Sequence, residues 1–155
     1  MKKLIFLSLL MIWAGSTFSQ RCDEYHISLR CKPSPQEAKD MVLSSQSRSA
    51  ELEAQKTYTF NMTFFRDMDY RIIFCTKSKF YPIHYVITEN ETGIVLFDNK
   101  DDDYVESIGF TSENTTIVTI ELTLLAEDAK FNDFRENRAC VGIPILYRKV
   151  KKMGF

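Results

Sequence analysis

The stretch from Tyr58 to Phe97 constrains the fold most, because it repeats an apolar alternating run, a polar or glycine break, and another run. Residues two positions apart lie on the same face of a β-strand, so this alternation indicates strands with one apolar face. Such a face must be covered by a second sheet or a helix. We therefore predict an all-β protein, an antiparallel β-sandwich of about seven to eight strands. The strands that we place are residues 57–65, 69–76, 82–89, 93–98, 104–110, 115–125 and 140–149.

The clearest of these strands is 115–125, in which four apolar residues alternate with polar ones: Val118, Ile120, Leu122 and Leu124. It contains no Pro, Gly or Lys to protect a free edge, so we predict that other strands flank it on both sides. The strand 140–149 repeats the alternation from Val141 to Tyr147. Pro144 within that strand favours an edge position or a bulge, because proline has no backbone N–H to donate.

The first residues have the features of a secretory signal peptide. Lys2 and Lys3 precede an apolar run that is too short to span a membrane, and Thr17 and Ser19 are small enough for the positions before a cleavage site. Cleavage after Ser19 would leave about 136 residues, the size of one domain, with no transmembrane segment, and would move the net charge from -1 to about -3. We therefore divide the chain into a signal peptide (1–19), an N-terminal segment (20–49) and a β-sandwich domain (50–155).

The N-terminal segment contains a helix-start pattern. Ser34 suits the N-cap, Pro35 the first helical position, and Glu37 the position from which a side chain reaches back to the cap. Residues 44–49 are polar and should end the helix. We predict one short N-terminal helix before the sandwich.

An even number of cysteines in an exported chain favours disulfides over metal thiolates. The four are Cys22, Cys31, Cys75 and Cys140, which allow three pairings. Cys22 and Cys31 are close in sequence, while Cys75 ends one predicted strand and Cys140 begins another. We favour Cys22 with Cys31 and Cys75 with Cys140; free buried thiols are the alternative.

Three segments carry a resemblance to a known group: YRIIFC at 70–75, ITENETGIVLFDN at 87–99 and CVGIPILYRKV at 140–150. Over residues 57–150 the chain resembles uncharacterised secreted β-sandwich proteins from Bacteroidetes. These in turn are similar to the jelly-roll domains that lie beyond the catalytic domain of secreted bacterial peptidases. The resemblance implies a jelly-roll-like sandwich that acts as an accessory, non-enzymatic module.

An acidic turn follows the predicted strand 93–98 and places five oxygen-bearing side chains in six residues. Side-chain oxygens on a turn are the ligands that calcium prefers, and this makes the turn a candidate calcium site. The spacing is not that of an EF-hand loop, and a solvated hairpin turn is the alternative. The residues are Asp98, Asn99, Asp101, Asp102 and Asp103. We expect no other cofactor.

The chain has few residues suited to catalysis. A serine or cysteine nucleophile needs a base, and zinc needs at least three ligands, yet His26 and His84 are the only histidines. His84 alternates with apolar residues in a strand, so we interpret it as a surface residue of that strand. We predict that the protein is not an enzyme.

The expected partner is a protein or a glycan. A sugar platform favours tryptophan, and Trp13 is lost with the signal, which leaves Phe80, Tyr81 and Tyr104 as candidates. No basic stripe is present, which argues against nucleic acid. We predict a secreted or periplasmic binding or assembly module. The alternatives are a carbohydrate-binding module, and a small hydrolase or peptidase-associated inhibitor with its site on the loop 126–138.

Overall fold

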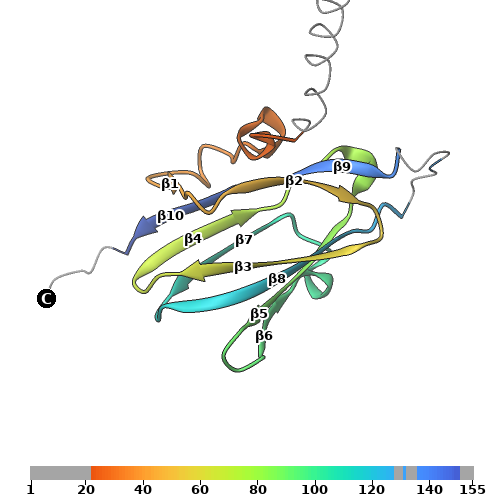
Figure 1. The fold of residues 1–155 in the computed structure, drawn as a ribbon. Coiled ribbons are helices and arrows are strands. Elements are labelled where there is room, and N and C mark those ends of the chain that lie inside the picture. The colour runs from red at the N-terminus through yellow and green to blue at the C-terminus, as the bar shows by residue number, and fades with distance from the viewer. Residues whose placement is uncertain (1–21, 128–130, 132–135, 151–155) are drawn as a thin grey trace, which may run out of the picture.

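The computed structural model describes residues 22–127, 131 and 136–150, and within them ten strands pack as two layers (Figure 1). The predicted signal peptide lies outside the described residues. One layer contains β1 (Val42–Leu43), β2 (Arg48–Glu53), β4 (Met68–Ile73), β7 (Ser107–Ser112), β9 (Arg138–Ile143) and β10 (Ile145–Lys149). The other contains β3 (Thr57–Phe64), β5 (Ile83–Glu89), β6 (Val95–Asp98) and β8 (Thr116–Leu124). The prediction of an all-β protein is confirmed.

Every strand pairing is antiparallel. The strand orders are β1-β10-β4-β7, β2-β9 and β3-β8-β5-β6. The pair β2-β9 continues the first of these sheets, because β9 and β10 are one run interrupted at Pro144, and Cys75, just beyond β4, bridges to Gly142 of β9. Pro144 therefore marks a break within a run that has neighbours on both sides, and not an edge strand.

Most predicted strands lie within a few residues of the observed ones, but the first two strands were missed. β1 and β2 fall in 42–53, where we predicted the end of a helix and only the beginning of the sheet. The predicted strand 104–110 begins instead at Ser107, because Asp103 and Tyr104 have positive φ angles of 51° and 56°, which turn the chain before β7.

The predicted N-terminal helix is wrong, although its start forms as expected. The backbone N–H of Ser34 donates to Glu37 Oε2 at 3.1 Å, and the N–H of Glu37 donates to Ser34 Oγ at 3.3 Å. One turn follows, with the N–H of Ala38 donating to the carbonyl of Ser34 at 3.0 Å. Asp40 then adopts a left-handed conformation (φ 59°), and the chain enters β1. Pairing with β10 replaces a helix that would have been too short to be stable alone.

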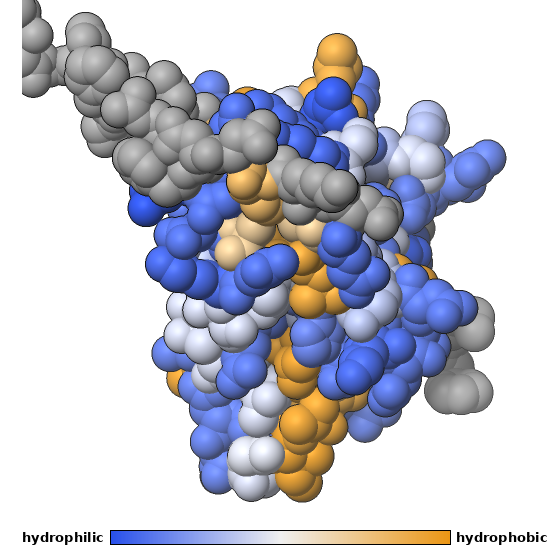
Figure 2. Space-filling view, turned by 90° about the vertical axis from the view of Figure 1, so that its right-hand side faces the viewer, coloured by the Kyte–Doolittle hydropathy of each residue, from blue (hydrophilic) through white to orange (hydrophobic). Residues whose placement is uncertain are grey.

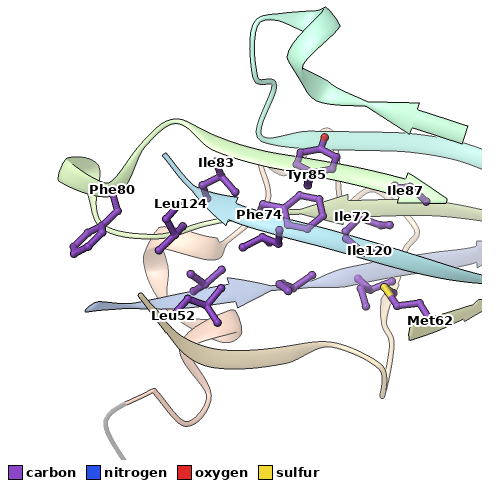
Figure 3. Close-up of a cluster of buried hydrophobic side chains, with 14 of the residues drawn as sticks. Leu52, Met62, Ile72, Phe74, Phe80, Ile83, Tyr85, Ile87, Ile120 and Leu124 are labelled. Atoms are coloured by element: carbon purple, nitrogen blue, oxygen red, sulfur yellow. The ribbon is translucent and has the colours of Figure 1, made fainter. Parts of the chain in front are cut away.

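The core lies between the layers and is centred on β8 (Figure 3). β8 pairs with β3 on one side and β5 on the other, which confirms that it is flanked on both sides. Its four alternating apolar residues are fully buried, each 0% exposed: Val118, Ile120, Leu122 and Leu124. The stacked rings of Phe74 and Tyr85, with centroids 3.9 Å apart, join the two layers beside them.

All four cysteines form disulfides, but the favoured pairing is wrong. The bonds are Cys22–Cys140 and Cys31–Cys75. Cys22 and Cys31 stand at the two ends of a pair of short 3-10 turns, η2 (Tyr25–Ile27) and η3 (Leu29–Cys31). η2 lies against β9 and β2. Cys22 reaches Cys140 in β9, and Cys31 reaches Cys75 just beyond β4, so neither cysteine bonds to its neighbour in sequence. The N-terminal segment is therefore fastened to the outer face of the sheet.

That outer face also carries carboxylates held in their charged form. The hydroxyl of Thr111 and the guanidinium of Arg148 donate hydrogen bonds to Asp69 and lower its pKa, and the bond from Thr111 has the larger effect. Hydrogen bonds from Ser34 lower the pKa of Glu37. Both groups thus favour folding when they are ionised, and this contribution is lost as protons bind.

We expect stability to change little from neutral pH to about pH 5 and to fall as the pH drops below the ordinary values of 4.5 for Glu37 and 3.8 for Asp69. The direction follows because the pKa values of both groups are lower in the folded state than in the unfolded one. Urea denaturation at a series of pH values measures it. Asp69→Asn should show a shallower acid decline than the wild type, and an equally steep decline would contradict the assignment.

Candidate functional site

Two free strand edges bound a groove along one side of the molecule. β6 ends one strand order and β7 ends the other, so no described strand pairs with the outer edge of either. Residues of both strands line the same groove. β6 ends at Asp98 and β7 begins at Ser107, so their connection crosses between the layers. The groove lies where the sandwich is open at its side.

The lining of this groove, which has a volume of about 380 Å³, is mainly apolar. The apolar residues come from four strands: Phe64, Ile87, Leu96, Phe97, Ile108 and Phe110. Ile87 pairs with Phe97 in register, so both side chains project to the inner face. Phe110 packs edge-on against Phe64, with ring centroids 4.8 Å apart. We call this the edge groove.

Three consecutive apolar side chains face solvent beside the edge groove. Ile94, Val95 and Leu96 are 58%, 56% and 51% exposed. The register with β5 shifts between Ile87 and Thr88, so alternation fails here and successive side chains do not return to the core. Figure 2 shows apolar surface extending to the lower end of the molecule, where the β5–β6 hairpin lies in Figure 1. We call these three residues the apolar edge; its free backbone and apolar side chains are features of an association site.

The predicted calcium ligands lie at the far end of β6, where Asn99 has a structural role. Asn99 is 0% exposed. Its Oδ1 accepts from the N–H of Tyr85 at 2.9 Å, and its Nδ2 donates to the carbonyls of Ile83 and Val105 at 2.8 and 3.1 Å. The amide thus fastens the turn η5 (Asn99–Asp102) to β5.

The neighbouring carboxylate is also engaged. The N–H of Lys100 donates to Asp98 Oδ1 at 3.0 Å, and His84 Nε2 lies 2.9 Å from the same oxygen. Both contacts lower the pKa of Asp98, and the hydrogen bond from Lys100 has the larger effect. Asp101, Asp102 and Asp103 are exposed, and within the described residues no group of three or more His, Cys, Asp or Glu is arranged to hold a metal. Calcium binding stays a prediction.

The two histidines lie apart from the edge groove lining. His26 Nδ1 is 2.9 Å from Ser49 Oγ, and the same oxygen accepts from the backbone N–H of His26 at 2.8 Å. Because one hydroxyl binds both groups, this pair fastens η2 to β2. The ring of His84 packs edge-on against Tyr104 at 5.9 Å and pairs with Asp98, on the half-buried outer face of β5.

The aromatic residues considered for sugar binding do not form an exposed platform. Phe80 is 1% exposed and stacks on Phe131, with centroids 5.5 Å apart. Tyr81 donates its hydroxyl to Glu106 at 3.3 Å, and burial raises its pKa to about 12. Tyr104 is half-buried. Within the loop 126–138, residues 128–130 and 132–135 lie outside the described residues, so a site there stays a prediction.

The apolar edge was missed from the sequence as a candidate site. The strand 93–98 was predicted, but its apolar residues were not considered as a binding surface. Ile94, Val95 and Leu96 are consecutive, and three consecutive apolar residues cannot all point to one face of a strand. That break in period was the available signal.

The comparisons with known proteins add little to this geometry. No protein-family model and no curated protein matches the chain, so the resemblance to secreted Bacteroidetes proteins stays a prediction. The crystal structure of Aeromonas hydrophila PliG, a periplasmic inhibitor of g-type lysozyme, is similar with a TM-score of 0.42 and 8% sequence identity. The match covers 68% of this chain and 90% of that one. None of the described helices is long and apolar enough to cross a membrane.

Proposed function

We propose that this chain is an exported, non-catalytic jelly-roll domain that binds another protein through the apolar edge and the edge groove. If β1 with β2, and β9 with β10, are each counted as one strand, the chain has eight strands. Numbered from one to eight along the chain, these strands have the orders 1-8-3-6 in one layer and 2-7-4-5 in the other. This is the strand order of a jelly roll, a fold that serves as a binding scaffold in many exported proteins.

The observation that carries the proposal is the exposed apolar edge beside an apolar groove. A free strand offers unpaired N–H and C=O groups, and an extended partner segment can pair with them. The exposed side chains of Ile94, Val95 and Leu96 would leave water at the same time. A protein supplies both the backbone groups and the apolar side chains, whereas a sugar supplies neither.

Export is supported by the cysteines. Disulfides persist in oxidising compartments, and two of them join the N-terminal segment to the sheet. A secreted or periplasmic location and the predicted signal peptide agree with this. Inhibition of a hydrolase, or an accessory role beside a peptidase, is one form that protein binding would take.

The test compares protein capture by the wild type and by Leu96→Lys. The immobilised domain is mixed with the secreted and periplasmic proteins of the cells that make it, and bound proteins are quantified by mass spectrometry after cross-linking. We expect at least one protein to be captured by the wild type and reduced about tenfold or more by the variant, because a lysine in the contact would bury a charge.

The matched control is Leu29→Lys. Leu29 is 88% exposed on η3, which lies at the opposite end of the molecule from the β5–β6 hairpin (Figure 1). This variant adds the same charge and should capture as the wild type does. Thermal melting of both variants checks that they are folded. If Leu96→Lys captures the same proteins in the same amounts as the wild type, the proposal is contradicted.

A further inference from the structure

From the charges around the edge groove, we infer that the partner is an extended protein segment in which lysine or arginine alternates with apolar residues. This inference rests on the proposed function and adds the chemistry of the partner. It begins with an imbalance of charge that is confined to one part of the chain.

Residues 84–116 contain one lysine or arginine, Lys100, although the whole chain is nearly balanced with 20 Lys and Arg against 21 Asp and Glu. This stretch forms β5, β6, η5 and β7, the elements around the edge groove. Its acidic residues are Glu89, Glu91, Asp98, Asp101, Asp102, Asp103, Glu106 and Glu113. We call them the acidic rim.

The acidic rim lies partly in the groove and partly in the segments before and after β6. Glu89 and Glu113 line the groove itself, and Glu91 lies in the hairpin loop next to the apolar edge. At the other end, Asp101 to Asp103 and Glu106 lie in the connection from β6 to β7. A segment that pairs with the whole length of β6 would therefore run from the acidic residues of the hairpin loop toward those of the β6–β7 connection.

These charges are almost entirely without partners of opposite sign. In the described part of the chain, Asp98 is the one member of the acidic rim within 4.0 Å of a basic nitrogen, that of His84. Acidic residues elsewhere do have basic partners, as Asp69 has in Arg148 at 2.9 Å and Glu37 in Arg71 at 3.8 Å. The uncompensated negative field would attract a cationic segment and favour its association.

The same field argues against a second copy of this chain as the occupant. Pairing two β6 strands edge to edge would bring two acidic rims together, and like charges across an interface are unfavourable. A partner with Lys or Arg on one face and apolar side chains on the other satisfies both features, because alternate residues of an extended segment point in opposite directions.

The test selects peptides from a displayed library of short linear sequences on the folded, disulfide-bonded domain. We expect the selected peptides to be positively charged with alternating apolar residues. Fluorescence anisotropy of a synthesised peptide then measures its affinity for the wild type, for two variants of the binding surface and for a control variant. Leu96→Lys should weaken binding about tenfold or more, and the double variant Glu91→Gln, Glu113→Gln about fivefold, with a weaker dependence on salt.

The matched control for the double variant is Asp23→Asn, Glu24→Gln. These two exposed acids lie in the N-terminal segment, away from the hairpin, and the variant changes the net charge by the same amount. It should bind as the wild type does. Peptides that are neutral or acidic but depend on Leu96 would overturn this inference and leave the proposed function standing. If no peptide binds, the inference is overturned. If peptides bind equally well to Leu96→Lys, both the inference and the proposed function are contradicted.

Discussion

Leu122→Ala should lower the free energy of unfolding by about 2 to 5 kcal/mol. Leu122 is 0% exposed on the inner face of β8, where it lies opposite Tyr58 on β3 and Tyr85 on β5. Removing its branched end leaves a cavity that two flanking strands cannot close without losing their hydrogen bonds. The loss is a large share of the stability of a domain of this size.

Thr123→Ala is the matched control, one residue along the same strand. Thr123 points to the opposite face, where its hydroxyl is 2.8 Å from that of Thr57. Losing this exposed hydrogen bond should cost less than about 1 kcal/mol. Urea denaturation of the two variants measures the difference. Equal losses would mean that β8 is in another register, since a shift of one residue exchanges the two faces.

The second large effect is expected at Gly142→Ala, with a loss of about 3 kcal/mol or more. A Cβ atom at Gly142 would lie 2.5 Å from Cys31 Sγ, 2.8 Å from Cys75 Sγ and 2.8 Å from the Cα of His26. Two of these atoms belong to a disulfide and the third to the backbone. None can move aside without displacing the N-terminal segment from the sheet.

Gly109→Ala is the control for the loss of a strand glycine. A Cβ there would lie 3.1 Å from the Cζ atom of Arg71, which is the far end of a flexible side chain. Arg71 can turn away, so we expect a change within about 0.5 kcal/mol. Melting temperatures measured without reductant compare the two variants. A tolerated Gly142→Ala would show that the N-terminal segment does not press on β9 as described.

The sequence alone predicted the structure correctly where the alternation of apolar residues within one segment determined it. The alternation from Val118 to Leu124 predicted the central strand and its buried face, because only a strand places alternate residues on one side. At Ser34 and Glu37 the local pattern was also correct, and the cap formed. The helix nevertheless stopped, because pairing of β1 with β10 depends on residues more than a hundred positions away.

The disulfides and the apolar edge depended on arrangement in space. Closeness in sequence suggested that Cys22 would pair with Cys31, but the turns between them place Cys22 beside Cys140 of β9 and Cys31 beside Cys75, just beyond β4. The exposure of Leu96 followed from a register shift between β5 and β6 and from the position of β6 at the end of a sheet. Neither can be obtained from the period of a single segment.

The Cys22–Cys140 bond also determines how the domain bears mechanical force. Tension applied between residues before Cys22 and residues after β10 passes through this bond and then along 141–149. The 117 residues between the two cysteines, including the apolar edge, lie outside this covalent path. Only the end of β9 and β10 can be peeled from the sheet, so the binding surface would keep its shape while the protein is pulled from both ends.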